Sequence, residues 1–432
     1  MGAIFQDGDP EFSGRWLLRK LARHRTVRVL LVRGLGMVAL FGFEVTLARW
    51  LGAGGYGAFS FALAVAMVVS RLAPLGWLNA STRYVSAFVS SHQLGLLRGT
   101  LIMAHAVTGF GLAISALLLM LLGLLWQSAT LALYIPHILP LMFALTVVEL
   151  HRYVLRGLHS GDLGEALSVL FLPVLAAASV WIFGIRDPAT ATYAYSLACL
   201  PLILLSTIAI AYRIPAGVWR VPARYQMRDW SAAGLAMLVG SLSDELTTRM
   251  AVIILGTLGN EHEAGLYQAA ARLALLNVFV LRVVTPVAAP TISALHQEGK
   301  FTELRSMFGR LCLMSLIGTL PIFVLFQLAA EPVLGWFGPE FTEAGGVLRL
   351  LSVGYLVSAA TGPCATALMM IGRERIYGKL ALANLLLNAV GSYVLVQYFG
   401  GFGAAIAMTC GIVVTNLVYV AIFLRATAPS HP

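Results

Sequence analysis

Two long apolar spans flank an acidic turn in the stretch Ser241–Arg282, which reads SLSDELTTRMAVIILGTLGNEHEAGLYQAAARLALLNVFVLR. The charged residues inside these spans are Asp244, Glu245, Arg249, Arg272 and Arg282. A charged side chain at the centre of a membrane helix costs about 2.5–3.5 kcal/mol on insertion scales, so it normally faces a bundle interior or water. The stretch therefore indicates a membrane protein whose functional surface lies between its helices.

The composition of the whole chain agrees with a membrane location. Of the 432 residues, 59% are hydrophobic and 11% are charged, whereas soluble domains carry roughly 25% charged residues. The net charge of +10 is spread over alternate loops rather than gathered in one basic patch, so we expect no nucleic-acid partner. The four cysteines lie in apolar spans without CxxC or Cys/His spacing, which predicts free thiols and no metal site.

The chain divides into twelve apolar spans of about 20 residues, the length needed to cross a hydrocarbon core of ~30 Å. Their approximate limits are 27–48, 57–78, 100–125, 131–151, 164–185, 191–212, 232–257, 265–295, 308–330, 346–371, 379–399 and 402–424. This pattern predicts an all-α polytopic membrane protein with about 12 transmembrane helices.

The basic residues outside the spans orient the chain. Twenty-one lie on the side of the N-terminus, and only Arg49 and Arg186 lie on the other side. The positive-inside rule then predicts that both termini are cytoplasmic. The segment Glu11–Arg25 places Trp16 and leucines among arginines, which is typical either of a basic amphipathic helix on an anionic membrane or of a simple positive arm.

The two halves of the chain repeat each other. Leu51-Gly52 recurs as Leu258-Gly259 and Leu97-Arg98 as Leu304-Arg305, both with an offset of 207 residues. Six spans in each half give the copies the same orientation, so they are parallel repeats. The predicted organisation is a cytoplasmic basic amphipathic segment (1–26), a six-helix lobe (27–213), a cytoplasmic linker (214–230), a second six-helix lobe (231–424) and a cytoplasmic tail (425–432).

Three segments resemble the polysaccharide-exporter branch of the multidrug/oligosaccharidyl-lipid/polysaccharide (MOP) exporter superfamily. The resemblance is carried by LARWLGAGGYGAFSFALAVA (47–66), LGWLNASTRYVSAF (75–88) and RMAVIILGTLGNEHEAGLYQAAARLA (249–274). The third contains the family's G-x-Y-x-x-A-x-R run at Gly265, Tyr267, Ala270 and Arg272. One departure is that many relatives have an acid just before the seventh-span arginine, where this chain has Thr248 before Arg249.

The resemblance implies a V-shaped pair of six-helix bundles, with the first, second, seventh and eighth helices lining a central cavity. It implies a flippase that moves undecaprenyl-diphosphate-linked oligosaccharides to the outer leaflet of the bacterial inner membrane, for export of O-antigen or exopolysaccharide. Such a protein is not an enzyme and has no catalytic residue. Its expected partners are the polyprenyl-diphosphate-linked glycan, the bilayer, and a polysaccharide polymerase with chain-length proteins.

Six arginines lie inside spans, and five of them fall in the four spans that this family places around the cavity. The five candidate substrate-binding residues are Arg33, Arg71, Arg249, Arg272 and Arg282. Guanidinium groups stay ionised and bind phosphate oxygens through two parallel hydrogen bonds, which suits a diphosphate. The alternative is that each arginine forms an internal ion pair or extends to the membrane interface.

Three acids inside the membrane are candidates for ion coupling, namely Glu44, Asp244 and Glu245. A partly buried carboxyl group near an arginine can bind a proton or sodium ion, or it can serve only as a counter-ion. No cofactor is expected, and a proton gradient, a sodium gradient or the membrane potential would supply the driving force. The potential alone contributes about 2.3 kcal/mol per charge per 100 mV.

Recognition of sugars is the least defined part of the predicted site. The candidates are Trp77, Asn79, Tyr267, Gln268 and Asn277, although aromatic and amide groups at helix ends also serve as interface anchors or packing. The alternative function is a cation-coupled multidrug exporter of the same superfamily, which is expected to have a more acidic cavity. An enzyme such as a lipid-linked sugar polymerase or ligase would need a sizeable outer loop that holds catalytic residues. This reading is disfavoured because the longest outer loop, about 331–345, contains no histidine or arginine.

Overall fold

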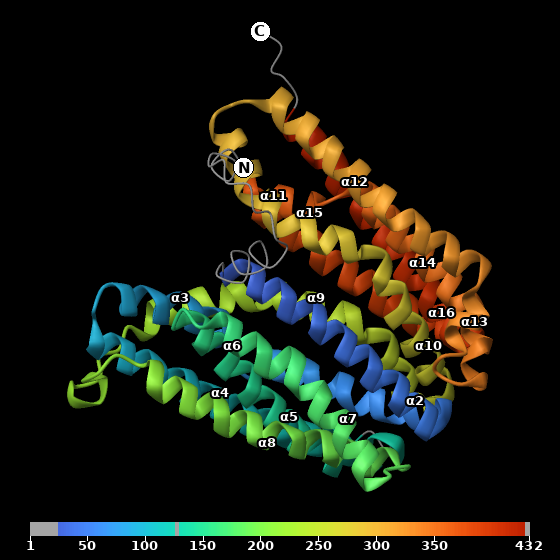
Figure 1. Ribbon diagram of the computed structural model, residues 1–432, viewed down its shortest axis with the longest axis horizontal. Coiled ribbons are helices and arrows are strands. Elements are labelled where there is room, and N and C mark those ends of the chain that lie inside the picture. Colours follow the sequence, from blue (N-terminus) through green and yellow to red (C-terminus); the bar gives the residue numbers. More distant parts are fainter. Residues whose placement is uncertain (1–24, 126–128, 428–432) are drawn as a thin grey trace, which may run out of the picture.

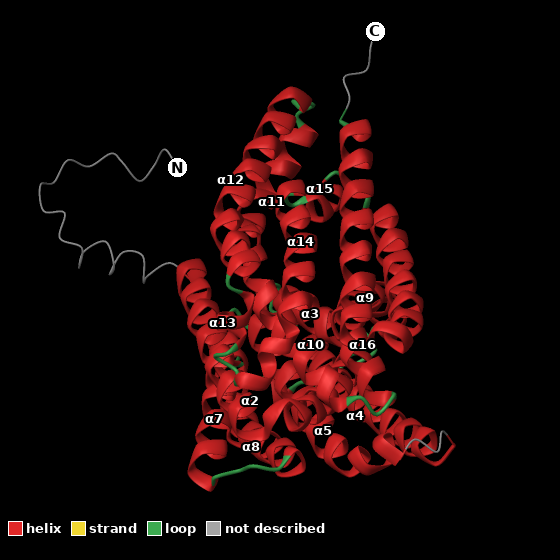
Figure 2. Ribbon diagram, turned by 90° about the vertical axis from the view of Figure 1, so that its right-hand side faces the viewer, coloured by secondary structure: helices red, strands yellow, loops and turns green. Residues whose placement is uncertain are grey.

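The computed structural model describes residues 25–125 and 129–427, and this part of the chain consists of helices and loops without a strand (Figures 1 and 2). The predicted amphipathic segment before Arg25 lies outside the described residues. The first lobe comprises α2 (Arg25–Leu72), α3 (Trp77–Ser90), α4 (Leu94–Leu125), α5 (Ala129–Gly157), α6 (Gly161–Glu165), α7 (Leu172–Phe183) and α8 (Pro188–Arg213).

The second lobe has the same number of membrane crossings. It comprises α9 (Met227–Thr257), α10 (Glu261–Ala274), α11 (Phe279–Gln297), α12 (Phe301–Leu328), α13 (Ala330–Leu334), α14 (Gly345–Thr361), α15 (Cys364–Met370) and α16 (Glu374–Ala426). A 3₁₀ turn, Leu275–Val278, joins α10 to α11, and a π-helical segment, Ala166–Phe171, joins α6 to α7.

Two of the helices are too long for a single crossing. α2 has 48 residues and α16 has 53, so each would extend over more than 70 Å at about 1.5 Å per residue. Both contain a glycine with positive φ and non-helical dihedrals, Gly52 in α2 and Gly400 in α16, where L side chains are disfavoured. Each of these helices therefore contains two crossings joined at its glycine.

The described residues contain nine helical segments that are long and apolar enough to cross a membrane. The division of α2 and α16, together with the more polar α9, brings the total over the described residues to twelve crossings. The prediction of an all-α polytopic membrane protein with about 12 transmembrane helices is confirmed. The protein is a multi-pass membrane protein.

The second crossing is longer than its predicted limits of 57–78. It is interrupted at 73–76, where Leu75 and Gly76 have positive φ, and it continues as α3 to Ser90. Hydropathy underestimates the length of this crossing because α3 packs its polar side on α5. Ser81 is fully buried there, and Thr82 donates a hydrogen bond to the Tyr153 carbonyl oxygen at 2.8 Å.

The two lobes meet at one end and diverge toward the other, as Figure 1 shows. We call the meeting end, which contains Gly52, Gly259 and Gly400, the closed end. The open end contains the turn Ser91–Gln93 and both ends of the described chain. The V-shaped arrangement expected from the resemblance is therefore present.

A backbone crossing joins the lobes at the closed end, where α2 packs on α10. A Cβ atom added at Gly57 would lie 1.8 Å from the Glu261 carbonyl oxygen, and one added at Gly265 would lie 2.0 Å from the Ala53 carbonyl oxygen. Only glycine allows this approach, and each lobe contributes one. The two contacts are reciprocal, since both pairs of residues are related by the same sequence interval of 208.

The linker between the lobes is attached to the first lobe. Arg98 Nη1 on α4 donates hydrogen bonds to the carbonyl oxygens of Trp219 and Val221, at 2.9 and 2.8 Å. The Arg224 backbone N–H donates to the Gly95 carbonyl oxygen at 2.9 Å. These contacts fix the linker along the open end of α4.

Candidate functional site: charged residues between the two lobes

An ion pair between the lobes lies nearest the closed end. Arg272 on α10 places Nε 2.7 Å from Glu44 Oε1 on α2, and the Glu44 side chain is only 4% exposed. The N–H direction is poor, however, because Arg272 Nε has no hydrogen-bond partner among the described residues. The contact is therefore a Coulombic pair whose hydrogen bond is not optimally formed.

A second ion pair between the lobes lies nearer the open end. Arg71 Nε, at the end of α2, is 3.5 Å from Glu245 Oε2 on α9. Glu245 also accepts a hydrogen bond from Arg249 Nε at 3.0 Å, one helical turn further along α9. Arg249 reaches across to the first lobe, where its Nη2 contacts Met67 Sδ.

Arg71 is shared between this pair and a group of residues on α5. Its Nη1 lies 3.1 Å from Glu149 Oε2 and donates to the Tyr153 hydroxyl group at 3.1 Å. Glu149 also binds Arg152 at 2.9 Å. The guanidinium groups of Arg71, Arg152 and Arg156 all lie 4.7–5.9 Å from the centre of the Tyr153 ring, a distance at which cation–π attraction operates.

The charges of the two ion pairs between the lobes and of the residues bonded to them nearly balance. The four guanidinium groups of this network are Arg71, Arg152, Arg249 and Arg272, and the three carboxylates are Glu44, Glu149 and Glu245. If all are ionised, one positive charge remains. This arrangement stabilises the arginines inside the membrane and leaves a modest excess of positive charge for an anion.

Arg33 belongs to a separate cluster inside the first lobe. Its Nε and Nη2 donate two hydrogen bonds of 3.1 Å to the buried Glu165, which also binds Arg156 at 2.6 Å. Arg28 pairs with Asp162 at 3.1 Å on the same side of α2. Half of the Arg33 side chain remains exposed, so it is accessible from the open end despite its partner.

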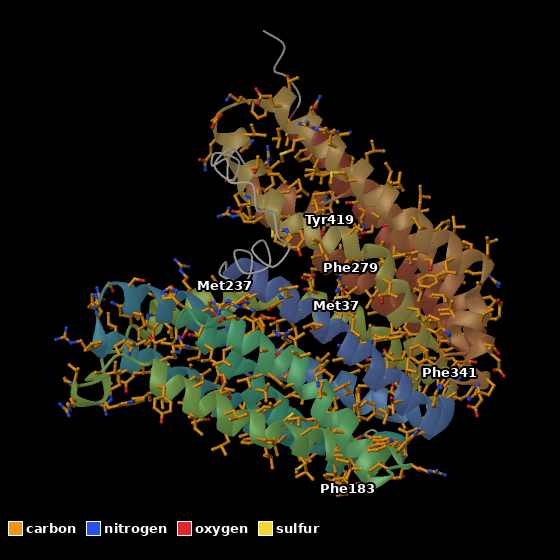
Figure 3. The ribbon with its side chains drawn as sticks, in the orientation of Figure 1. Met37, Phe183, Met237, Phe279, Phe341 and Tyr419 are labelled. Atoms are coloured by element: carbon orange, nitrogen blue, oxygen red, sulfur yellow. The ribbon has the colours of Figure 1, made fainter. Side chains whose placement is uncertain are left out.

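Arg282 differs from the other four predicted substrate-binding arginines. It is exposed near the start of α11 and has neither an ion pair nor a side-chain hydrogen bond among the residues that the structure describes. Figure 3 places Phe279, from the same turn, and Met37 of α2 where the two lobes face one another. Arg282 is therefore the arginine that an anion could reach without displacing a carboxylate.

The predicted ion-coupling acids have different surroundings. Glu44 is buried against Arg272, and Glu245 is shared by two arginines. Asp244 is exposed on α9 and forms no ion pair within the described part of the chain. The geometry gives Glu44 and Glu245 the role of counter-ions, and ion coupling through any of the three stays a prediction.

Most of the predicted sugar-contacting side chains are packed between helices. Trp77 packs edge-on against Trp230, with 5.9 Å between ring centroids. Asn277 is fully buried and donates to the Ala274 carbonyl oxygen and to Ser352 Oγ. Tyr267 and Gln268 are less than 10% exposed. Of this set only Asn79 is partly accessible in the present conformation.

The sequence reasoning missed Glu149, Glu165 and Tyr153. Both acids lie inside predicted spans, so counting every span acid would have found them. The spacing of Glu149 and Arg152, three residues apart on one helical face, was a further signal. The contact of Tyr153 with Arg71 could not be predicted from the sequence, because it depends on the packing of α2 against α5.

Sequence comparisons find similarity to proteins of glycan biosynthesis. Residues 169–345 match the family described as "Polysaccharide biosynthesis protein". A similar protein is the probable low-salt glycan biosynthesis flippase Agl15 of Haloferax volcanii, which is 21% identical over 183 residues. The match covers 42% of this chain and 39% of that protein, so it spans about two fifths of the relative's length.

Structural comparisons extend over nearly the whole chain. The inward-facing conformation of a multidrug resistance MATE family transporter of the MOP superfamily has a TM-score of 0.76 and 15% identity, over 93% of this chain and 98% of that one. The lipid II flippase MurJ, in an inward closed conformation, has a TM-score of 0.65 and 12% identity, over 92% and 87%. At these identities the likeness concerns the fold.

These structural neighbours are a transporter and a flippase, and the sequence relative is a probable flippase. The predicted resemblance is confirmed to this extent: the middle of the chain matches a polysaccharide biosynthesis family, and almost the whole chain has the fold of transporters such as those of the MOP superfamily.

Proposed function

We propose that this protein is a flippase for lipid-linked glycans, which moves polyprenyl-diphosphate-linked oligosaccharides between the leaflets of a membrane by alternating access. The observation that carries the proposal is the concentration of arginines on α2, α9, α10 and α11, where the two lobes face each other within the membrane. A diphosphate needs such groups because lipid does not solvate an anion. The names of the sequence relative and of MurJ support a lipid-linked substrate.

The arrangement of charges defines how such a substrate would sit. The diphosphate would bind at the arginines, the glycan would occupy the space between the diverging lobes, and the polyprenyl tail would remain in the bilayer. Arg282 would make the first contact because it is exposed and unpaired within the described residues. Undecaprenyl as the lipid is an inference from the resemblance.

The direction of transport follows from the distribution of basic residues. The positive-inside rule places the open end in the cytoplasm and the closed end outside. In a bacterial inner membrane the substrate would therefore load from the cytoplasmic leaflet. The cytoplasm is at a negative electrical potential, so a dianion that leaves it moves to a state of lower electrostatic energy. The membrane potential therefore favours export without a separate coupling ion.

Flipping of a fluorescent polyprenyl-diphosphate oligosaccharide in proteoliposomes tests the proposal. The native protein should expose the label to a membrane-impermeant quencher, and Arg282→Ala should slow this exposure at least about tenfold. Arg349→Ala is the matched control, since Arg349 is also a span arginine but pairs with Glu331 in the second lobe. An inactive native protein that exports cationic dyes instead would replace this proposal with a multidrug exporter.

A further inference from the structure

The two ion pairs between the lobes share one topological pattern. In each, a glutamate from the first crossing of one lobe meets an arginine from the second crossing of the other lobe: Glu44 with Arg272, and Glu245 with Arg71. The glutamates are 201 residues apart in sequence, and so are the arginines. Each lobe therefore contributes one glutamate and one arginine across the interface, at positions six residues away from exact repeat equivalence.

The two pairs lie at different depths. Glu44 is eight residues before Gly52, whereas Glu245 is fourteen residues before Gly259, the corresponding glycine at the closed end. Six residues of helix correspond to about 9 Å. The Glu44–Arg272 pair is thus the inner of the two contacts, closer to the glycine crossing, and it must separate when the lobes part at the closed end.

The carboxylates occupy the positions that an anionic ligand needs. A carboxylate and a phosphate group bind a guanidinium group through the same oxygen geometry, so they compete for it. The Glu44–Arg272 contact is incompletely formed, because Arg272 Nε lacks a hydrogen-bond partner among the described residues although Glu44 Oε1 is 2.7 Å away. A ligand oxygen with better alignment would satisfy this group.

We propose that Glu44 and Glu245 hold the lobes together in the empty transporter and that a diphosphate group releases them by taking over Arg272 and Arg71. Each replacement removes an ion pair between the lobes, so binding of the anion favours opening of the closed end. The identity of the anion rests on the function proposed above. The exchange itself rests on the two ion pairs and requires no additional ion.

This exchange makes reorientation depend on the ligand. Without an anion, parting the lobes would leave the buried Glu44 and Arg272 unpaired inside the membrane, which is costly. With the anion bound, Arg272 keeps a negatively charged partner, so only Glu44 has to be solvated or protonated as the lobes part. A ligand shifts a conformational equilibrium only through different affinities for the two states, and the replaced carboxylates provide this difference.

The distance between spin labels at the closed end tests the exchange. In a cysteine-free background, labels at Arg186→Cys and Tyr398→Cys would report on the first and second lobes, because both positions are exposed close to the closed end. We expect a short distance in the native protein without ligand and a growing long-distance population when inorganic pyrophosphate is added.

Three variants separate the ion pair from general effects of charge. Glu44→Gln should raise the long-distance population without ligand about fivefold or more. The double variant Glu44→Arg with Arg272→Glu restores the pair in reverse and should keep the distance short without ligand. Glu165→Gln is the matched control, because Glu165 is as buried as Glu44 but its partner Arg33 is in the same lobe.

The proposal is wrong if Glu44→Gln keeps the native distance, or if the reversed pair or the control opens as much as Glu44→Gln. Calorimetric titration with inorganic pyrophosphate gives a second readout: Glu44→Gln should bind it about tenfold more tightly because the competitor is gone, and unchanged or weaker binding contradicts the exchange. If the label distances and the pyrophosphate titration come out as expected but the native protein does not flip the lipid-linked glycan, the exchange of ion pairs is supported and the proposed substrate is wrong.

Discussion

Glu340 Oε2, in the second lobe, accepts a hydrogen bond of 2.9 Å from the backbone N–H of Ala53 in the first lobe, 287 residues away in sequence. Ala53 directly follows the positive-φ glycine at which α2 turns into its second crossing. The carboxylate therefore caps the N-terminus of a helix that belongs to the other lobe. Negative charge at such a position is favourable because the first N–H groups have no partner within the helix.

Replacing this cap should weaken the closed end. Glu340→Ala removes a hydrogen bond to a charged acceptor and should cost about 1.5–3 kcal/mol of contact between the lobes. The expected result is a larger long-distance population between labels at Arg186 and Tyr398. Glu343→Ala is the control, because Glu343 is exposed and lies 3.6 Å from His262 without contacting the helix start; equal opening by both variants would rule out a specific cap.

A methyl group at the glycine crossing should force the lobes apart. In Gly265→Ala the new Cβ atom would lie 2.0 Å from the Ala53 carbonyl oxygen, a backbone atom that cannot move alone. We expect a loss of thermal stability corresponding to about 1–3 kcal/mol. Gly309→Ala, with no atom within 4 Å of its added Cβ and a position inside α12, should be neutral or slightly stabilising. Equal melting temperatures for the two variants would contradict the close approach.

The arginines should separate into two classes on substitution. Arg272→Ala leaves Glu44 buried without its partner, which should destabilise the protein by about 3–5 kcal/mol. Arg282→Ala leaves no carboxylate behind and should lower flipping while the melting temperature stays the same. Thermal unfolding monitored beside the flipping assay separates the classes. A stable but inactive Arg272→Ala would show instead that the Glu44 pair contributes little to stability.

The orientation in the membrane can be tested with single cysteines. His92 is exposed in a turn at the open end, and Tyr398 is exposed beside the closed end. In intact bacterial cells expressing a cysteine-free protein, an impermeant thiol reagent should label Tyr398→Cys and spare His92→Cys until the membrane is opened. The reverse pattern would place both termini outside.

The twelve crossings could be predicted from sequence because each requires a long apolar stretch. The interruption at 73–76 and the continuation through α3 could not, because the polar residues of α3 are satisfied by α5 rather than by solvent. Hydropathy treats Thr82 as unfavourable in a membrane and has no information about its partner. The second crossing was accordingly predicted too short.

The charged site was predictable only in part. Pairing of Glu245 with Arg249 follows from their spacing of four residues on one helix. Pairing of Glu44 with Arg272 depends on how two lobes cross, which no local pattern contains. Arg152 and Arg156 lie just past a predicted span end, so they were assigned to a cytoplasmic segment although they join the network around Tyr153.

The glycine crossing has a consequence for the rate of transport. Where Gly57 and Gly265 meet, backbone lies on backbone and no side chains of these two residues interdigitate. One lobe can rotate over the other at this point without a change of rotamer in either of them. The activation barrier for reorientation should then arise mainly from separating the buried charges, and raising the ionic strength should change turnover little, because salt screens buried ion pairs weakly.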